Sequence, residues 1–288
     1  MHDHVSPRPV IALQAPRVTL VPRHFDFGAK IALSYLLLSV LWIIGSDRAV
    51  DWMLPDSEFA TWAQSVKGLV FVTLSAVVLY LAVHLYIKRL AQANEDLQVA
   101  WEESLLGWAM AMDAREPDMA QHSQRVASLT VMLARFMGVD DQDLPAVYRG
   151  ALLHDIGKIS VPDAVLQFPG PLDEEQWALM RKHPETARRI LEPIEFLQDA
   201  IDIPYCHHER WDGTGYPRGL AGTDIPLWAR IFAIVDVYDA LSSKRVYRVA
   251  MPTSAVLDHI KSGSGSHFDP DVVAAFCRLI GQLQVQVR

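Results

Sequence analysis

The sequence is poor in cysteine and has no excess of positive charge, and each shortage excludes a class of protein. Its two cysteines, Cys206 and Cys277, lie far apart in the chain and cannot form the CxxC pair of a structural zinc site. The formal net charge is −8. This argues against bulk nucleic-acid binding, which depends on a basic surface. An anionic small substrate would therefore have to be held by metal ions and a few local cations.

Two long apolar runs stand out in the first third of the chain. Residues 31–46 carry no charge, and residues 68–87 contain one ionisable group, His84. Both runs approach the ~17–25 residues that cross a bilayer as a helix, so we expect a transmembrane hairpin over residues 31–87 with a short external loop. A buried hairpin of a soluble protein is the alternative. A cleaved signal peptide fits poorly, because the first run starts about 30 residues into the chain.

Basic residues flank this hairpin at its two outer ends, in an N-terminal arm (residues 1–30) and directly after the second run. They are Arg8, Arg17, Arg23, Lys30, Lys88 and Arg89. The segment between the two runs is mainly acidic. The positive-inside rule then places both termini in the cytoplasm. We expect a multi-pass protein of the inner (cytoplasmic) membrane whose C-terminal domain lies in the cytoplasm, where a structural disulfide is not expected.

A helical linker, residues 88–107, follows the hairpin. Apolar or interface-type residues recur around it in alternating steps of three and four, which is a heptad pattern. They are Ile87, Leu90, Asn94, Leu97, Trp101, Ser104 and Trp108. The pattern favours a parallel homodimer whose register is fixed by Asn94. The alternative is one amphipathic helix that packs on its own domain.

Residues 108–288 are expected to form one all-α domain. Hydrophobic periodicity and stop signals predict helices over 118–137, 144–157, 172–183, 185–191, 225–242, 253–262 and 270–285. Residues 210–227 are rich in glycine and proline and predict a loop. No segment is typical of a long strand.

Two motifs concentrate imidazole and carboxylate groups: HDIGK at 154–158 and HHERWDGTGYP at 207–217. Neutral imidazole and carboxylate oxygen are ligands of divalent transition metals. His154, Asp155, His207 and His208 are therefore candidate ligands, and at a helix end His154 and Asp155 can serve two metal ions.

Three further candidate ligands are His122, His183 and Asp236. His122 could instead be a surface residue, and His183 could interact with a helix terminus. Asp236 lies in an apolar run, where a carboxylate is costly to bury unless it is paired or bound to metal. Asp239 is either a helper of Asp236 or a surface residue.

Seven candidate ligands exceed what one octahedral ion needs, so we infer at least two metals. Ligation by nitrogen and oxygen alone suits Fe, Mn or Zn. Two close metals activate water for hydrolysis of phosphate esters. Lys158 is placed to contact a phosphate oxygen or to assist the leaving group, and Arg245 and Arg248 are further phosphate candidates. All three could also be ordinary exposed cations.

Taken together, HDIGK, HPE, HHERWDGTGYP and VDVYDALSSKRVYR resemble the HD-GYP subgroup of the HD-domain phosphohydrolases. The resemblance implies an all-α helical bundle that hydrolyses cyclic di-GMP to pGpG and/or GMP. It implies that the seven candidates bind metal, that Lys158 assists at the phosphate, and that Arg245 contacts phosphate. It also implies a substrate loop formed by Gly215, Tyr216 and Pro217.

In some members of the subgroup an acidic residue binds a third metal, and Asp118 occupies that position here. The cofactor is therefore expected to be two or three divalent ions, with Fe or Mn preferred. The chain departs from the common pattern at Gln121, where many members have glycine, and near Phe168, where many have a basic residue.

The expected function is that of a membrane-anchored, dimeric cyclic di-GMP phosphodiesterase, with the activity implied by the resemblance. A diguanylate cyclase is a further expected partner. The alternatives are a non-catalytic cyclic di-GMP receptor and a phosphodiesterase for another cyclic nucleotide. The complete ligand set argues for the enzyme, because a receptor would tolerate the loss of ligands.

Overall fold

The computed structural model describes residues 24–55, 58–116, 121–243 and 250–286. Several residues singled out above lie outside this described part: Arg8, Arg17, Arg23, Asp118, Arg245 and Arg248. The contacts divide the chain into two units, Met1–Ala91 and Gln92–Arg288. The described residues contain no strand, only the isolated bridges Asp212–Ala221 and Ser264–Phe268, so the all-α expectation is confirmed.

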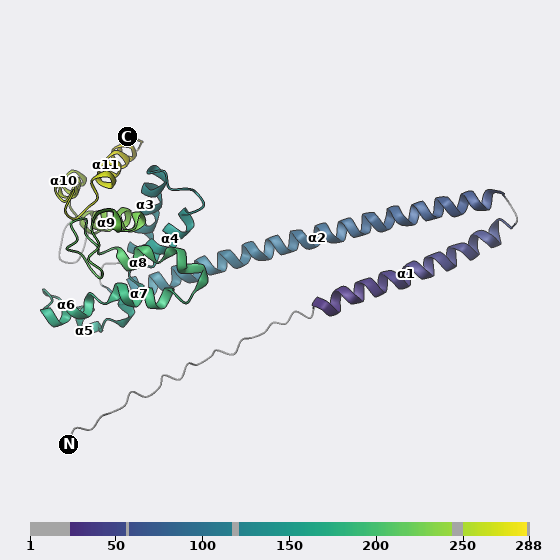
Figure 1. Cartoon of the computed structure of the whole chain (residues 1–288), viewed down its shortest axis with the longest axis horizontal. Helices are drawn as coiled ribbons and strands as arrows, with labels where there is room; N and C mark the ends of the chain where they lie inside the picture. Colours follow the sequence, from purple (N-terminus) through teal and green to yellow (C-terminus); the bar gives the residue numbers. More distant parts are fainter. Residues whose placement is uncertain (1–23, 56–57, 117–120, 244–249, 287–288) are drawn as a thin grey trace, which may run out of the picture. The chain divides into compact units, whose positions relative to one another are not determined.

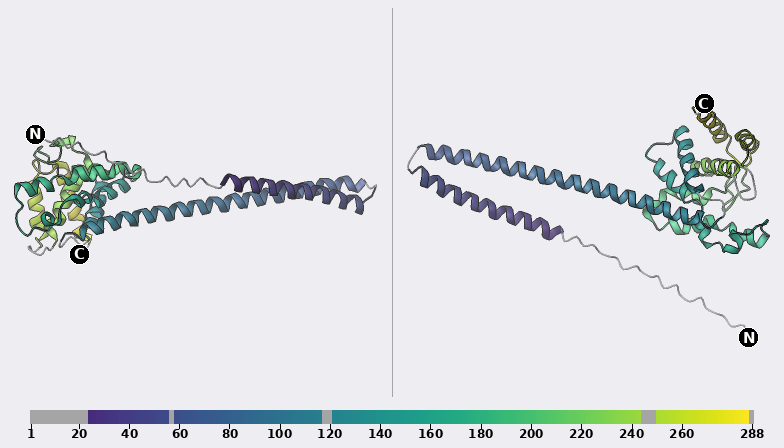
Figure 2. Two further views of the ribbon diagram at one scale, coloured as in Figure 1. Left: turned by 90° about the horizontal axis from the view of Figure 1, so that it is seen from below. Right: turned by 180° about the vertical axis from the view of Figure 1, so that it is seen from behind.

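The first unit contains α1 (His24–Met53) and the first part of α2 (Glu58–Asp113). The two helices run side by side in Figures 1 and 2. Phe71 stacks between Tyr35 and Trp42, with ring centroids 6.5 and 6.0 Å apart, and Lys67 pairs with Asp47. Both helices are long and apolar enough to cross a membrane, and their apolar side chains are largely exposed. The runs predicted at 31–46 and 68–87 lie inside them.

Helix α2 continues without a break into the second unit, where its last turns join the core through Leu105, Ala109 and Met112. The expected linker and the start of the expected domain are therefore parts of one helix. On the heptad seam, Leu97 is 56% exposed and Trp101 is 48% exposed.

The second unit consists of helices joined by turns and, between α8 and α9, by a long loop over residues 207–226 (Figure 1). After α2 come α3 (His122–Phe136), α4 (Leu144–Leu152), α5 (Asp163–Leu166), α6 (Glu174–Met180), α7 (His183–Leu191), α8 (Asp202–Cys206), α9 (Leu227–Ser242), α10 (Thr253–Ser262) and α11 (Pro270–Gln286). Short 3-10 turns are η1 (Ile156–Ser160), η2 (Glu195–Ala200) and η3 (Gly222–Asp224).

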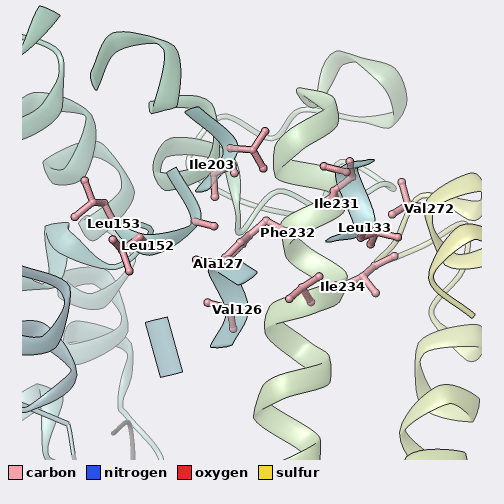
Figure 3. Packing of buried hydrophobic residues seen from close by; sticks show 14 of the residues in the cluster. Val126, Ala127, Leu133, Leu152, Leu153, Ile203, Ile231, Phe232, Ile234 and Val272 are labelled. Carbon is pink, nitrogen blue, oxygen red and sulfur yellow. The ribbon is translucent and has the colours of Figure 1, made fainter. Parts of the chain in front are cut away.

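Helix α9 lies at the centre of the hydrophobic core. Its sequence is apolar almost all round, which is typical of a fully buried helix. Ile231, Phe232 and Ile234 are inaccessible to solvent, and Figure 3 shows Ile231 beside Leu133 of α3 and Val272 of α11, with Phe232 beside Ala127 of α3. Each such side chain contributes about 1.5–3 kcal/mol on burial. This packing fixes the helix that carries Asp236.

The helix predicted over 144–157 ends earlier than expected. Helix α4 stops at Leu152, and the chain turns through η1 with i→i+3 hydrogen bonds such as Ile156 N–H to Leu153 O at 3.0 Å. Gly157 then packs on the first turn of α7, where a Cβ atom would overlap the carbonyl oxygen of His183 and lie 2.7 Å from the nitrogen of Ala187. The turn separates His154 and Asp155 from the regular helix.

Two other boundaries differ from the prediction. Pro184 does not separate two helices; it occupies the first turn of α7, a position where its missing N–H is not needed. Helix α8 lies in a stretch for which no helix was predicted, because it has only five residues and contains Pro204.

Gln121 precedes α3 in a left-handed conformation, with φ at 61°. This conformation costs an L-residue roughly 1–2 kcal/mol and costs glycine almost nothing. The departure from glycine noted in the sequence therefore places strain directly before His122.

We expect Gln121→Gly to raise the free energy of unfolding of the full chain by about 0.5–1 kcal/mol, because relief of strain outweighs the added freedom of the unfolded state. Chemical denaturation of the protein in detergent measures this. Lys182→Gly is the matched control, since Lys182 precedes α7 at φ −83° and also makes no side-chain cap. An equal change in both variants would contradict the strain argument.

Candidate metal centre

Two groups of potential ligands meet in the second unit. One consists of His183, His207 and His208, and the other of His122, His154 and Asp236; within each group the ligand atoms lie within 4.8 Å of one another. Their side chains come from the start of α3, the α4–η1 turn, the start of α7, the end of α8 and the middle of α9. The fold thus gathers residues that are separated by up to 114 positions in the sequence.

Asp155 lies between the two groups. Its Oδ2 atom is 3.0 Å from His154 Nε2, while its Oδ1 atom is 3.5 Å from His183 Nε2 and 3.9 Å from His207 Nε2. One carboxylate therefore faces both groups with different oxygens, which is the arrangement of a ligand that can serve two cations.

Three of the imidazole rings are each oriented by a backbone carbonyl group, that of the residue three positions earlier in the chain. Nδ1 of His154 donates to Ala151 O at 2.9 Å, Nδ1 of His183 donates to Met180 O at 2.8 Å, and Nδ1 of His207 donates to Pro204 O at 3.1 Å. A proton on Nδ1 leaves Nε2 with its lone pair, and hydrogen bonding at the other nitrogen is typical of metal-binding histidine.

His122 is oriented by a carboxylate instead. Its Nδ1 donates to Asp239 Oδ2 at 2.7 Å, and Arg125 holds the other oxygen of Asp239 at 2.7 Å. Nε2 of His122 is buried without a hydrogen bond and lies 3.4 Å from Asp236 Oδ1. Asp239 was expected either to help Asp236 or to be exposed; it is a buried partner of His122.

The donor set fits a divalent cation. Nε2 of His183 and Nε2 of His207 are 3.2 Å apart, and both carry lone pairs when their Nδ1 atoms are donors. Two acceptors face each other stably only when a proton or a cation lies between them. Burial, supported by the neighbouring His183 and His154, lowers the pKa of His207 to about 3, and burial also lowers the pKa of His183 and of His208. These rings are therefore neutral ligands near pH 7.

In the second ligand group (His122, His154 and Asp236), His122 holds its proton more tightly than the histidines of the first group. Burial opposes the charged form of His122, but the nearby carboxylates of Asp236 and Asp239 outweigh burial and raise the pKa of His122 to about 9. A cation bound here would have to replace that proton, so binding releases a proton and strengthens as the pH rises.

Lys158 lies half-buried between two carboxylates. Its Nζ lies 2.7 Å from Asp155 Oδ2 and 2.7 Å from Glu116 Oε1. Burial would lower the pKa of Lys158, but the charges of Asp155 and Glu116 outweigh burial and raise it. Lys158 is thus a proton-bearing donor rather than a base. Glu116 was not predicted as a site residue, because nothing in the sequence links it to a lysine 42 positions away.

The expected substrate loop is built on Glu209. This buried carboxylate accepts the N–H groups of Arg218 at 2.7 Å and Leu220 at 3.0 Å. The Tyr216 ring stacks on His208 with centroids 4.7 Å apart, so Tyr216 supports that ring as well as lining the loop. Gly215 packs on the backbone of Glu209, where a Cβ atom would be 2.5 Å from Cα. Pro217 follows through a cis peptide bond.

A cavity of about 500 Å³ adjoins the centre at His208. It is lined by Trp177, Arg181, His208, Arg210, Thr214, Gly215, Tyr216 and His267. Trp177, Arg181, Arg210, Thr214 and His267 had not been singled out in the sequence. The seven predicted ligands, Lys158, Gly215 and Tyr216 lie at or beside the centre, whereas Asp118, Arg245 and Arg248 lie outside the described residues.

Comparison with known proteins gives the family of the chain. The HD domain family matches residues 108–272, and the chain belongs to this family. Over 180 residues it is 38% identical to 3'3'-cGAMP-specific phosphodiesterase 2 of Vibrio cholerae, which covers 62% of this chain and 34% of that protein. It is 40% identical over 161 residues to cyclic di-GMP phosphodiesterase PA4108 of Pseudomonas aeruginosa, covering 56% of this chain and 39% of that protein.

One solved structure, Bd1817, a HDG"Y"P protein from Bdellovibrio bacteriovorus, matches 56% of this chain and 51% of its own at 24% identity and a TM-score of 0.47. The chain spans about a third to a half of the length of the curated relatives it matches.

We expect Asp239→Ala to weaken metal binding by about 10–100-fold, because His122 loses the partner that fixes its ring. Asp239→Asn keeps an acceptor for Nδ1 and should lose less. Metal content and affinity of the full chain, measured by metal analysis after dialysis against graded chelator, test this. Asp141→Asn is the control, since Asp141 is exposed and pairs only at the surface with Arg135. Equal metal affinity in the Asp239→Ala and Asp141→Asn variants would contradict the assigned role.

Proposed function

We propose that this chain is a membrane-anchored, metal-dependent phosphodiesterase that hydrolyses cyclic di-GMP to pGpG and/or GMP. The observation that carries the proposal is the pair of ligand groups joined by Asp155, together with the Nε2 atoms of His183 and His207, which face each other at 3.2 Å. The names of the relatives support the same class of substrate.

We assign two divalent ions, one to His183, His207 and His208 and one to His122, His154 and Asp236, with Asp155 between them. Nitrogen and oxygen ligands favour Fe or Mn over a closed structural zinc site. When bound, such ions activate water and neutralise charge on a phosphate. A third ion held by Asp118 stays a prediction.

The chain's own residues supply orientation and charge. Lys158 stays protonated, so it donates to a phosphate oxygen or to the departing oxygen, and Glu116 sets the position of its ammonium group. The cavity at His208 lies within the ~300–1,000 Å³ typical of ligand sites. Tyr216 closes the cavity beside the metal ligands, and Arg245 and Arg248 are proposed phosphate contacts.

A second candidate substrate is 3'3'-cGAMP, because two of the relatives at 38% identity are named as specific for it. A purely receptor function is less well supported, because every expected ligand within the described residues is present and buried or half-buried.

We also propose that residues 31–87, which lie in α1 and the first part of α2, form the membrane anchor and that two chains pair along the α2 seam. Charged side chains are absent from the positions beside the seam, which are Ala91, Ala93, Gln98 and Ala100. Two identical helices can therefore approach without repulsion between like charges. The inner membrane location and a diguanylate cyclase partner remain predictions from the sequence.

Full-length protein in detergent, loaded with Fe or Mn without oxygen, should convert cyclic di-GMP to pGpG or GMP. The ratio of kcat/KM for cyclic di-GMP and 3'3'-cGAMP, read by chromatography of the products, decides between the two substrates. Full metal occupancy with no turnover of either would overturn the enzyme and favour the receptor.

His154→Ala should remove metal and activity together, because His154 belongs to the second ligand group and its Nε2 lies 3.0 Å from Asp155 Oδ2. Metal counting and turnover are measured on the same sample. His259→Ala is the control, as His259 lies on α10 outside both groups. Activity that survives in the His154→Ala protein would show that the ligand assignment is wrong.

A further inference from the structure

Helix α6 has a well-capped first turn, but none of its side chains is part of the hydrophobic core. Its first turn is closed by a capping box in which Gln176 N–H donates to Asp173 at 2.8 Å and the Gln176 side chain accepts the Asp173 N–H at 3.0 Å. None of its seven residues is buried. Trp177 on this helix is 39% exposed. Trp177 therefore does not stabilise the hydrophobic core, which suggests that its ring has a role in binding.

Trp177 faces the cavity that begins at the metal centre. The same cavity is lined by His208 and Tyr216 at the metal end and by Trp177 and Arg181 from the α6 side. A ligand whose phosphate reaches His208 therefore extends toward an indole ring. Aromatic rings beside guanidinium groups are the usual means by which proteins stack and hold nucleobases.

Arg181 directly follows α6 and belongs to the same corner. Its Cζ atom lies 5.6 Å from the centroid of the Trp177 ring. Its ion pair with Glu174 is long, at 3.9 Å, and both side chains are more than half exposed, so this pair contributes little. The guanidinium is therefore available to a ligand that stacks on Trp177.

Arginine distinguishes the purine bases by their edges. Guanine offers two acceptors, O6 and N7, to the two parallel donors of a guanidinium, whereas adenine offers the N7 acceptor beside an amino donor. An arginine next to a stacked purine therefore favours guanine.

We propose that Trp177 and Arg181 form the guanine-binding end of the cavity and set the base preference of the site. The proposal rests on the proposed function and deepens it, because it names the part of the cyclic dinucleotide that each residue recognises. Trp177 supplies the stacking surface, and Arg181 contacts the O6 and N7 edge.

The first test is the steady-state kinetics of the metal-loaded full chain with cyclic di-GMP. Trp177→Ala should raise KM by about 5- to 100-fold, the effect of losing one stacked base, while kcat falls much less. Trp177→Phe keeps an aromatic ring and should restore most of the binding. Leu179→Ala is the matched control, since Leu179 is 41% exposed on the same helix and is not part of the cavity lining. Equal KM values for Trp177→Ala and Leu179→Ala would overturn the proposal.

The second test compares bases. The parent protein should bind GMP more tightly than AMP, and Arg181→Ala should bring the two affinities to within about threefold of each other, because the loss of a bidentate contact removes most of the discrimination. Calorimetric titration measures both affinities. A preference for GMP that survives in Arg181→Ala would overturn the role of Arg181.

Failure of the proposed function gives a different result. If the metal-loaded parent hydrolyses no cyclic dinucleotide, the phosphodiesterase assignment is wrong, and the GMP titrations of the parent, Trp177→Ala and Leu179→Ala still decide the base site. If the parent hydrolyses cyclic di-GMP but the Trp177 and Arg181 variants behave like the Leu179→Ala control, the phosphodiesterase assignment is supported and the proposed base site is wrong.

Discussion

The half-buried Asp155 carboxylate is the group on which the whole centre depends. It is the contact shared by both ligand groups, and it also holds the Lys158 ammonium. Burial alone would raise the pKa of Asp155, but the charges of His154 and Lys158 outweigh it and lower the pKa well below its usual range. A buried charge is tolerated only when it is compensated in this way. Three of the other candidate ligands lie around this carboxylate, with Nε2 of His154 at 3.0 Å, of His183 at 3.5 Å and of His207 at 3.9 Å.

The hydrophobic core positions several of these ligands. Phe232 on the central helix α9 packs against the rings of His154 and His207, with centroids 4.8 and 5.9 Å apart. The same helix presents Asp236 to the centre one turn later. Apolar packing and metal ligation thus use neighbouring residues of one helix, so a change in the core would be transmitted directly to the ligands.

Much of this arrangement could be predicted from the sequence. The features that could not be predicted depend on tertiary contacts, which leave no local signal in the sequence. Helix α10 was predicted over its observed residues, and the start of α11 at Pro270 was also correct, because Pro, Gly and a regular apolar period mark both helices. The turn after α4 was missed, since the close approach of Gly157 to α7 is a tertiary contact.

The partners of the site residues were the least predictable. Asp239 lies three positions after Asp236, which suggested a local pair, yet its partner is His122, which lies 117 positions earlier in the chain. Glu116 carries no spacing signal of its own, and Glu209 lies within the motif HHERWDGTGYP but was given no role from the sequence. The ligands could be recognised by residue type and motif, whereas the groups that orient them depend on distant helices meeting.

The backbone anchors of three histidines have an evolutionary consequence. A carbonyl oxygen remains in place whatever side chain occupies its residue, so substitutions at Ala151, Met180 or Pro204 that preserve the turn leave the ring orientation unchanged. His122 has no such protection, because its orientation depends on the single side chain of Asp239. Drift in related sequences should therefore disable the His122 side of the centre first and leave the His183 and His207 side intact.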